Sequence, residues 1–207
     1  MKNYFLILIL FINYSCNAQN KSLMVPEIDN RFERFDSFKY DSLYKKNSNY
    51  IKDTLNNGTY IEMNVANYGK SYSITTKDSY YTITKVYYPN GIIKTKGVSN
   101  NTETFQVGIW YEFDEEGKLV KEIDYDKPYK FTFEDILKFC EKEKIEIRKG
   151  PILQSTGWYN EISRSIENGQ PIWRIEHLKK TNLIEIIKLD GVTGKVLGTE
   201  TYDYINN

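Results

Sequence analysis

The stretch FQVGIWYEFDEEGKLVKEIDY (residues 105–125) decides the fold of the chain. It contains two runs rich in aromatic and β-branched residues, one on each side of the acidic turn Asp114-Glu115-Glu116-Gly117. Such runs favour β-strands, and glycine supplies the positive φ that many tight turns need. The stretch therefore predicts an antiparallel hairpin with a polar turn.

Similar runs precede this hairpin. YYTITKVYY (80–88) ends at Pro89-Asn90-Gly91 and is followed by IIKTKG (92–97), which predicts another pair of strands. Further upstream, YIKDTLNNGTYIEMNV (50–65) places two extended runs around Asn57-Gly58, a dipeptide typical of a type I′ hairpin turn. The whole region therefore predicts successive antiparallel strands joined by short turns.

Two of these segments together resemble the MORN-variant repeat, once labelled a toxin–antitoxin repeat. They are YYPNGIIKTKG (87–97) and VGIWYEFDEEGKLVKEIDY (107–125), and the residues that fit the repeat pattern are Tyr88, Gly91, Gly108, Trp110, Tyr111, Gly117, Lys118 and Leu119. The resemblance implies a sheet of hairpins. A stack of such repeats needs about three copies to bury a core, and only roughly one and a half are visible. We therefore expect the sheet to pack against another part of the chain.

The C-terminal part predicts one helix followed by a meander of strands. Thr132 and Asp135 have the spacing of a capping box, and the residues on one helical face are Phe133, Ile136, Leu137 and Cys140. Strands are expected at about 161–166, 171–178, 183–189 and 195–203. Asp190, Thr193, Gly194, Lys195 and Val196 resemble the end of the PepSY domain. That resemblance implies a module that restrains peptidases.

The first residues predict export and lipidation. Residues 4–12 are almost wholly apolar, but the run is shorter than the about 20 residues that span a bilayer, and it predicts a signal peptide. The residues before Cys16 (Ile12-Asn13-Tyr14-Ser15) resemble the looser lipoboxes of Bacteroidota lipoproteins. The resemblance implies cleavage after Ser15 and lipidation of Cys16. The alternative is an ordinary signal peptide with Cys16 unmodified.

The residues after Cys16 indicate where the protein is held. No acidic residue occurs before Glu27, whereas surface-exported Bacteroidota lipoproteins usually carry acidic residues directly after the lipidated cysteine. The resemblance therefore implies a lipid anchor in the bacterial cell envelope, on the outer membrane and facing the periplasm. Residues 17–34 are polar without clear periodicity and predict a tether, and residues 35–46 have near-helical spacing that predicts a short helix.

The predicted fold class is α+β and mostly antiparallel β, with a MORN-like hairpin sheet followed by a helix packed on a meander sheet. The predicted organisation is a lipoprotein signal peptide (1–15), a tether with a possible short helix (16–49), the hairpin region (50–129) and the PepSY-like region (130–207). Charge is balanced, with 28 basic and 28 acidic residues. This balance gives no indication of a nucleic-acid partner.

No residue set in the sequence points to catalysis, a cofactor or a metal ion. His177, the only histidine, alternates with apolar residues, which favours a packed side chain over a general base. Gly69-Lys70-Ser71 and Gly194-Lys195 each lack part of the phosphate-loop pattern. Cys140 lies on the apolar helix face and is expected to be a core thiol, which makes a disulfide with Cys16 implausible.

Aromatic residues on neighbouring strands are the remaining functional signal. Tyr88, Trp110, Tyr111 and Phe113 are candidates for an exposed surface that contacts a protein or glycan, and the alternative is that they belong to the core. The sequence thus predicts an extracytoplasmic binding or scaffold protein that is not an enzyme. It attaches to the membrane through the lipid on Cys16, and its partner is an unknown envelope protein or peptide. The alternatives are an immunity lipoprotein that neutralises a secreted toxin, a peptidase-restraining module and, more distantly, an enzyme.

Overall fold

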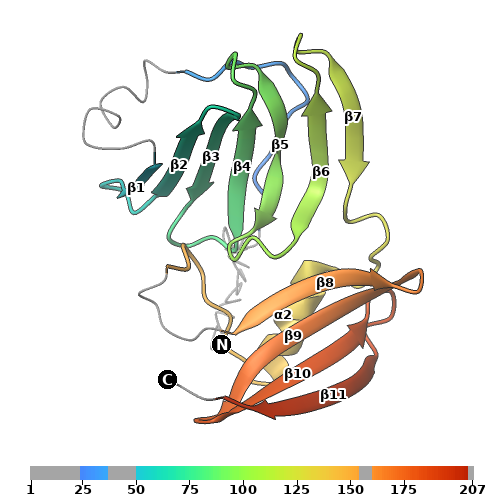
Figure 1. Cartoon of the computed structure of the whole chain (residues 1–207). Helices are drawn as coiled ribbons and strands as arrows, with labels where there is room; N and C mark the ends of the chain where they lie inside the picture. Colours follow the sequence, from blue (N-terminus) through green and yellow to red (C-terminus); the bar gives the residue numbers. More distant parts are fainter. Residues whose placement is uncertain (1–23, 37–49, 154–159, 205–207) are drawn as a thin grey trace, which may run out of the picture.

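The computed structural model describes residues 24–36, 50–153 and 160–204, and this part of the chain contains two antiparallel sheets and one helix (Figure 1). The first sheet follows the chain order: β1 (Tyr50–Thr54), β2 (Tyr60–Ala66), β3 (Gly69–Thr75), β4 (Tyr81–Tyr87), β5 (Ile93–Asn100), β6 (Gln106–Phe113) and β7 (Leu119–Asp124). Helix α2 (Phe133–Lys142) follows. The second sheet has the order β11 (Val196–Asp203), β10 (Leu183–Asp190), β9 (Gln170–Lys180) and β8 (Glu161–Glu167). The mostly antiparallel α+β class is confirmed.

The hairpin between β1 and β2 forms where the sequence predicts it, but its turn differs from the expected type I′. A type I′ turn requires positive φ at both central residues. Here Gly58 has a φ of 78° whereas Asn57 does not have positive φ, and the Gly58 N–H donates to the Leu55 carbonyl. The turn with two positive φ angles lies instead between β8 and β9, at Asn168 (51°) and Gly169 (81°).

Strand β3 is an element that the sequence patterns did not predict. It begins at Gly69-Lys70-Ser71 and pairs with β2 on one side and with β4 on the other. Its residues alternate, with Tyr72 in a buried cluster and Ser71 and Ser73 half-buried on the opposite face. Because only one face of β3 carries an apolar side chain, its sequence lacks the usual strand pattern. The Gly69-Lys70-Ser71 sequence begins this strand and does not form a phosphate loop.

Residues 24–36, which we call the strap, lie along the first sheet (Figure 1). The Phe35 N–H donates to the Gly91 carbonyl (2.8 Å), and the Ile93 N–H donates to the Glu33 carbonyl (3.1 Å). The prediction of a free tether is therefore wrong for these residues, because they hydrogen-bond to the sheet and cover its apolar face. The rest of the tether, most of the short helix at 35–46, the signal peptide and Cys16 lie outside the described residues.

The two sheets share one hydrophobic core with α2. This cluster joins side chains of the first sheet (Tyr81, Val98, Val107), of the helix (Phe133, Ile136, Cys140) and of the second sheet (Ile162, Trp173, Ile175, Ile187, Leu189). The helix begins with the predicted capping box, in which Thr132 and Asp135 exchange hydrogen bonds. The expectation that the hairpin sheet packs against the C-terminal part is met by this shared core.

Candidate functional site

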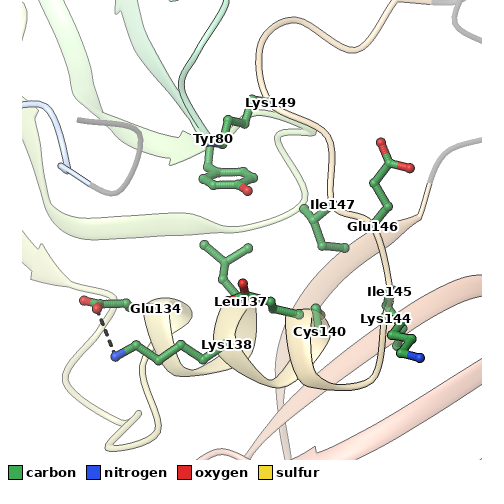
Figure 2. A pocket seen from close by; sticks show the side chains of 11 residues that line it. Tyr80, Glu134, Leu137, Lys138, Cys140, Lys144, Ile145, Glu146, Ile147 and Lys149 are labelled. Atoms are coloured by element: carbon green, nitrogen blue, oxygen red, sulfur yellow. Dashed lines mark ion pairs between the residues drawn. The ribbon is translucent and has the colours of Figure 1, made fainter. Parts of the chain in front are cut away.

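A groove of about 490 Å³ lies between α2, the start of β4 and the segment that follows the helix (Figure 2). We call it the α2 groove. Its lining residues are Tyr80, Glu134, Leu137, Lys138, Cys140, Glu141, Lys144, Ile145, Glu146, Ile147 and Lys149. Its volume falls within the range of about 300–1,000 Å³ that is usual for ligand pockets.

The inner part of the α2 groove is apolar. Cys140 and Ile145 are buried in the shared core, and Leu137, Ile147 and Tyr80 pack against that core while remaining half-buried. Figure 2 shows Leu137 pointing toward the ring of Tyr80, with Ile147 beside them. The groove therefore offers an apolar surface that no described residue covers fully, and this surface suits an apolar side chain.

Charged side chains surround this apolar part and balance one another. The lining includes three acidic residues (Glu134, Glu141, Glu146) and three basic ones (Lys138, Lys144, Lys149). Lys138 pairs with Glu134 at 3.0 Å, and the Lys149 ammonium lies 5.3 Å from the centre of the Tyr80 ring. The rim thus carries no net formal charge, and it does not select for a strongly anionic or cationic ligand.

The wall formed by residues 144–149 is held in place by contacts from distant parts of the chain. The Asn101 side-chain amide donates to the carbonyls of Arg148 (2.9 Å) and Gly150 (2.8 Å). The Asn160 amide donates to the Glu146 carbonyl (2.9 Å). One side of the groove is therefore a backbone segment positioned by a turn of the first sheet and by the residue before β8.

Cys140 lies at the base of this groove, and the state of its thiol decides whether the groove contains a nucleophile. Burial raises the pKa of its thiol to about 12, so the thiolate that acts as a nucleophile is almost absent at neutral pH. In a Cys16→Ala variant, where Cys140 is the only thiol, we expect no reaction with a thiol reagent in the folded state and full reaction after denaturation. Cys140→Ala should lower the free energy of unfolding by about 1–2 kcal/mol. Rapid labelling of the folded protein would contradict this packing.

The predicted aromatic partner surface is wrong for two of its four residues. Tyr111 is 9% exposed and Phe113 is 2% exposed, because both belong to the apolar cluster beneath the strap. Ile28 and Phe35 of the strap pack against this cluster. The sequence could not show this coverage, since it depends on a segment about 80 residues away that was expected to be a tether.

The other two residues, Tyr88 and Trp110, are half-buried, and they do not form one exposed patch with each other. Trp110 neighbours Tyr111 in β6 and therefore points to the opposite face, where its ring lies against Gly97 and its indole N–H donates to the Val98 carbonyl (2.8 Å). A β-carbon at position 97 would collide with this ring. The Tyr88 hydroxyl donates to the Phe113 carbonyl (2.9 Å). Both side chains thus have structural contacts.

The segment that resembles the end of the PepSY domain forms the turn between β10 and β11. The Asp190 carboxylate accepts hydrogen bonds from the N–H groups of Val192 and Thr193. The bond from Thr193 is the main reason why the pKa of Asp190 falls to about 2, and the Gln170 amide adds to it. Gly194 takes a φ of 71° and lies against the Phe131 ring. These residues therefore have a structural role in the turn.

His177 lies in β9, an inner strand of the second sheet, opposite Glu185 of β10. Its Nε2 lies 3.0 Å from a Glu185 carboxylate oxygen, and Lys179 binds the other oxygen of that carboxylate. In the described ranges, no group of three or more histidine, cysteine, aspartate or glutamate residues is arranged to hold a metal ion. Within the same ranges, no helix has the length and hydropathy needed to cross a membrane.

Comparison with known proteins adds no assignment to this geometry. No protein-family model, no curated protein and no solved structure matches the chain. The resemblances to the MORN-variant repeat, the PepSY domain and the lipobox therefore stay predictions, and the candidate site rests on its own residues.

Proposed function

We propose that the protein is a lipid-anchored, extracytoplasmic binding protein without catalytic activity, and that it holds an envelope protein or peptide in the α2 groove. The observation that carries this proposal is the apolar inner part of the groove behind a charge-balanced rim. A partner that inserts an apolar side chain there would bury Leu137, Ile147 and Tyr80. Apolar burial contributes roughly 25 cal/mol per Å².

The chemistry of the groove supports binding over reaction. Its only thiol is neutral at physiological pH, and its carboxylates lie at the rim, where Glu134 is paired with Lys138. In the backbone wall at 144–149 the carbonyls of Glu146 and Arg148 already accept hydrogen bonds, so a partner would bond to other N–H and C=O groups of this segment. A peptide partner could therefore combine an apolar anchor with main-chain hydrogen bonds, which is a recurring mode of peptide recognition.

The groove is tested with Leu137→Glu in the full-length protein. The variant places a carboxylate on the apolar surface, and a bound partner would have to desolvate it. We expect partner binding to fall by about tenfold or more, which corresponds to about 1.4 kcal/mol. Photo-crosslinking from position 138 in intact envelopes identifies the partner. The partner is then purified in its free form, and its affinity for the wild type and for Leu137→Glu is measured by titration.

The matched control is Leu197→Glu, which makes the same substitution at a side chain of β11 that is 49% exposed. This variant should bind as the wild type does. Equal binding by Leu137→Glu, with the fold intact by circular dichroism, would show that the partner does not use the groove.

The anchor is tested separately. Cys16→Ala should move the protein from the membrane fraction into the soluble envelope fraction, because the lipid attached to the Cys16 sulfur holds it on the bilayer. Fractionation followed by immunoblotting measures the change. A Cys16→Ala variant that still sediments with membranes would mean that lipidation of this residue is not the anchor.

A further inference from the structure

A second hollow, of about 310 Å³, lies on the first sheet on the face opposite the strap. Its lining residues are Tyr50, Glu62, Asn64, Ser71, Tyr72, Ser73, Thr84 and Glu103, and Tyr72 contributes its backbone. Residues along a strand alternate between faces. Met63 and Tyr72 belong to the cluster beneath the strap, so their neighbours Asn64, Ser71 and Ser73 point to the other face.

The side chains of this hollow are almost all polar, and several of them have unused hydrogen-bonding capacity. Asn64, Ser71 and Ser73 make no side-chain hydrogen bond to other described residues. Thr84 Oγ1 is buried and has no hydrogen-bond partner among the described atoms. Leaving a buried hydroxyl unpaired is unfavourable, and a ligand that hydrogen-bonds to this hydroxyl would remove that cost.

Two carboxylates stand at the hollow in different surroundings. Glu62 accepts from the Tyr50 hydroxyl and from the Tyr60 hydroxyl (3.4 Å), and Lys52 lies 3.7 Å away. Glu103 sits in the turn between β5 and β6 with a φ of 57°, a conformation that non-glycine residues seldom adopt. Glu103 is an exposed residue, and the pKa of its carboxyl is raised first by partial desolvation and then by the negative charge of Glu62.

We propose that this hollow is a binding site for a neutral, hydroxyl-rich ligand, namely a saccharide unit. Sugar hydroxyls can donate to the Glu103 carboxylate and can both donate to and accept from Asn64, Ser71 and Ser73. The volume lies at the lower end of the range for ligand pockets, about 300–1,000 Å³, and suits one or two sugar rings.

Other ligand classes fit this set of side chains less well. An anion would be repelled by Glu62 and Glu103. An apolar ligand would leave the amide and the hydroxyls without hydrogen bonds, at a cost for each group. A simple cation would engage the carboxylates alone and would leave Asn64, Ser71 and Ser73 without a role. The saccharide site is separate from the α2 groove and does not depend on it.

The test is binding of defined neutral oligosaccharides to the full-length protein, held in a detergent that contains no sugar. Gluco-, manno- and galacto-configured trisaccharides and N-acetylglucosamine trimers are titrated by calorimetry. We expect saturable binding of at least one of them. Asn64→Leu and Thr84→Val should each weaken that binding by about tenfold, the effect of about 1.4 kcal/mol.

The control is Thr95→Val, which removes a hydroxyl from β5 at a position that does not line the hollow. This variant should bind as tightly as the wild type, and so should Leu137→Glu, which alters only the α2 groove. The proposal is overturned if none of the four probes binds, if Asn64→Leu and Thr84→Val bind normally, or if a sulfated trisaccharide binds more tightly than its neutral counterpart.

Discussion

Replacing Trp173 with alanine is expected to lower the free energy of unfolding by about 3–5 kcal/mol, the usual cost of truncating a buried aromatic side chain. Trp173 is 0% exposed and lies at the junction of the two sheets and α2. Its ring contacts those of Phe105 and Phe133, and its indole N–H donates to the Phe131 carbonyl (2.8 Å). The substitution would leave a cavity and an unpaired carbonyl in the shared core.

Urea unfolding followed by circular dichroism measures this loss. Tyr68→Ala, at a side chain that is 81% exposed, is the control and should change the stability by less than about 0.5 kcal/mol. Domains are often stable by only about 5–15 kcal/mol, so Trp173→Phe, with a smaller cavity, provides an intermediate variant if Trp173→Ala does not fold. A loss below about 1 kcal/mol for Trp173→Ala would mean that the two sheets do not share a core.

Replacing Lys96 with methionine is expected to release the strap and to lower the free energy of unfolding by about 1.5–3 kcal/mol, the usual contribution of hydrogen bonds made by a charged group. The Lys96 side chain is 3% exposed. Its ammonium binds the Asp29 carboxylate (3.1 Å) and the Arg31 carbonyl (2.7 Å), and Glu33 lies 3.6 Å away. Methionine keeps much of the packing of the aliphatic stem and removes the charge.

Limited proteolysis of residues 24–36 measures release of the strap, and urea unfolding measures the stability. Lys94→Met, at an exposed position of the same strand, is the control and should leave the strap protected. Equal protease resistance of Lys96→Met and wild type would show that the strap is held by its apolar contacts alone.

The same contacts predict how the strap responds to acid. The pKa of Asp29 is lowered from 3.8 to about 2, mainly by the Arg31 side chain and then by Lys96. A carboxyl with a depressed pKa in the folded state stabilises the protein above its unfolded pKa, and this contribution disappears as the pH falls toward the folded pKa. Cleavage of the wild-type strap by pepsin should therefore increase between about pH 4 and pH 2.

The second sheet shows how far local sequence patterns reach. Strands were expected at about 161–166, 171–178, 183–189 and 195–203, and the structure places β8 to β11 within a few residues of these bounds. The capping box at Thr132 and the helix that follows it are also as predicted. Such elements depend on residues close together in the chain, namely alternation, periodicity, caps and turn residues.

The predictions that failed depend on contacts between distant residues. The strap at 24–36 has polar composition, and its docking requires the Lys96 ammonium and the Gly91 carbonyl on the first sheet. The coverage of Tyr111 and Phe113 follows from that docking. Strand β3 has polar residues on one face, and its assignment depends on pairing with β2 and β4.

The sequence by itself determined the fold class, the hairpins around their glycine turns, the capped helix and the expectation that Cys140 is a core thiol, because each of these depends on neighbouring residues. Only the tertiary structure decided which aromatic residues are covered, where the α2 groove opens and which polar side chains meet on the far face of the first sheet. Those features bring together groups far apart in the chain, such as Asn101 and Arg148, or Glu62 and Glu103. Their proximity arises from the packing of the two sheets and the strap, which no local pattern encodes.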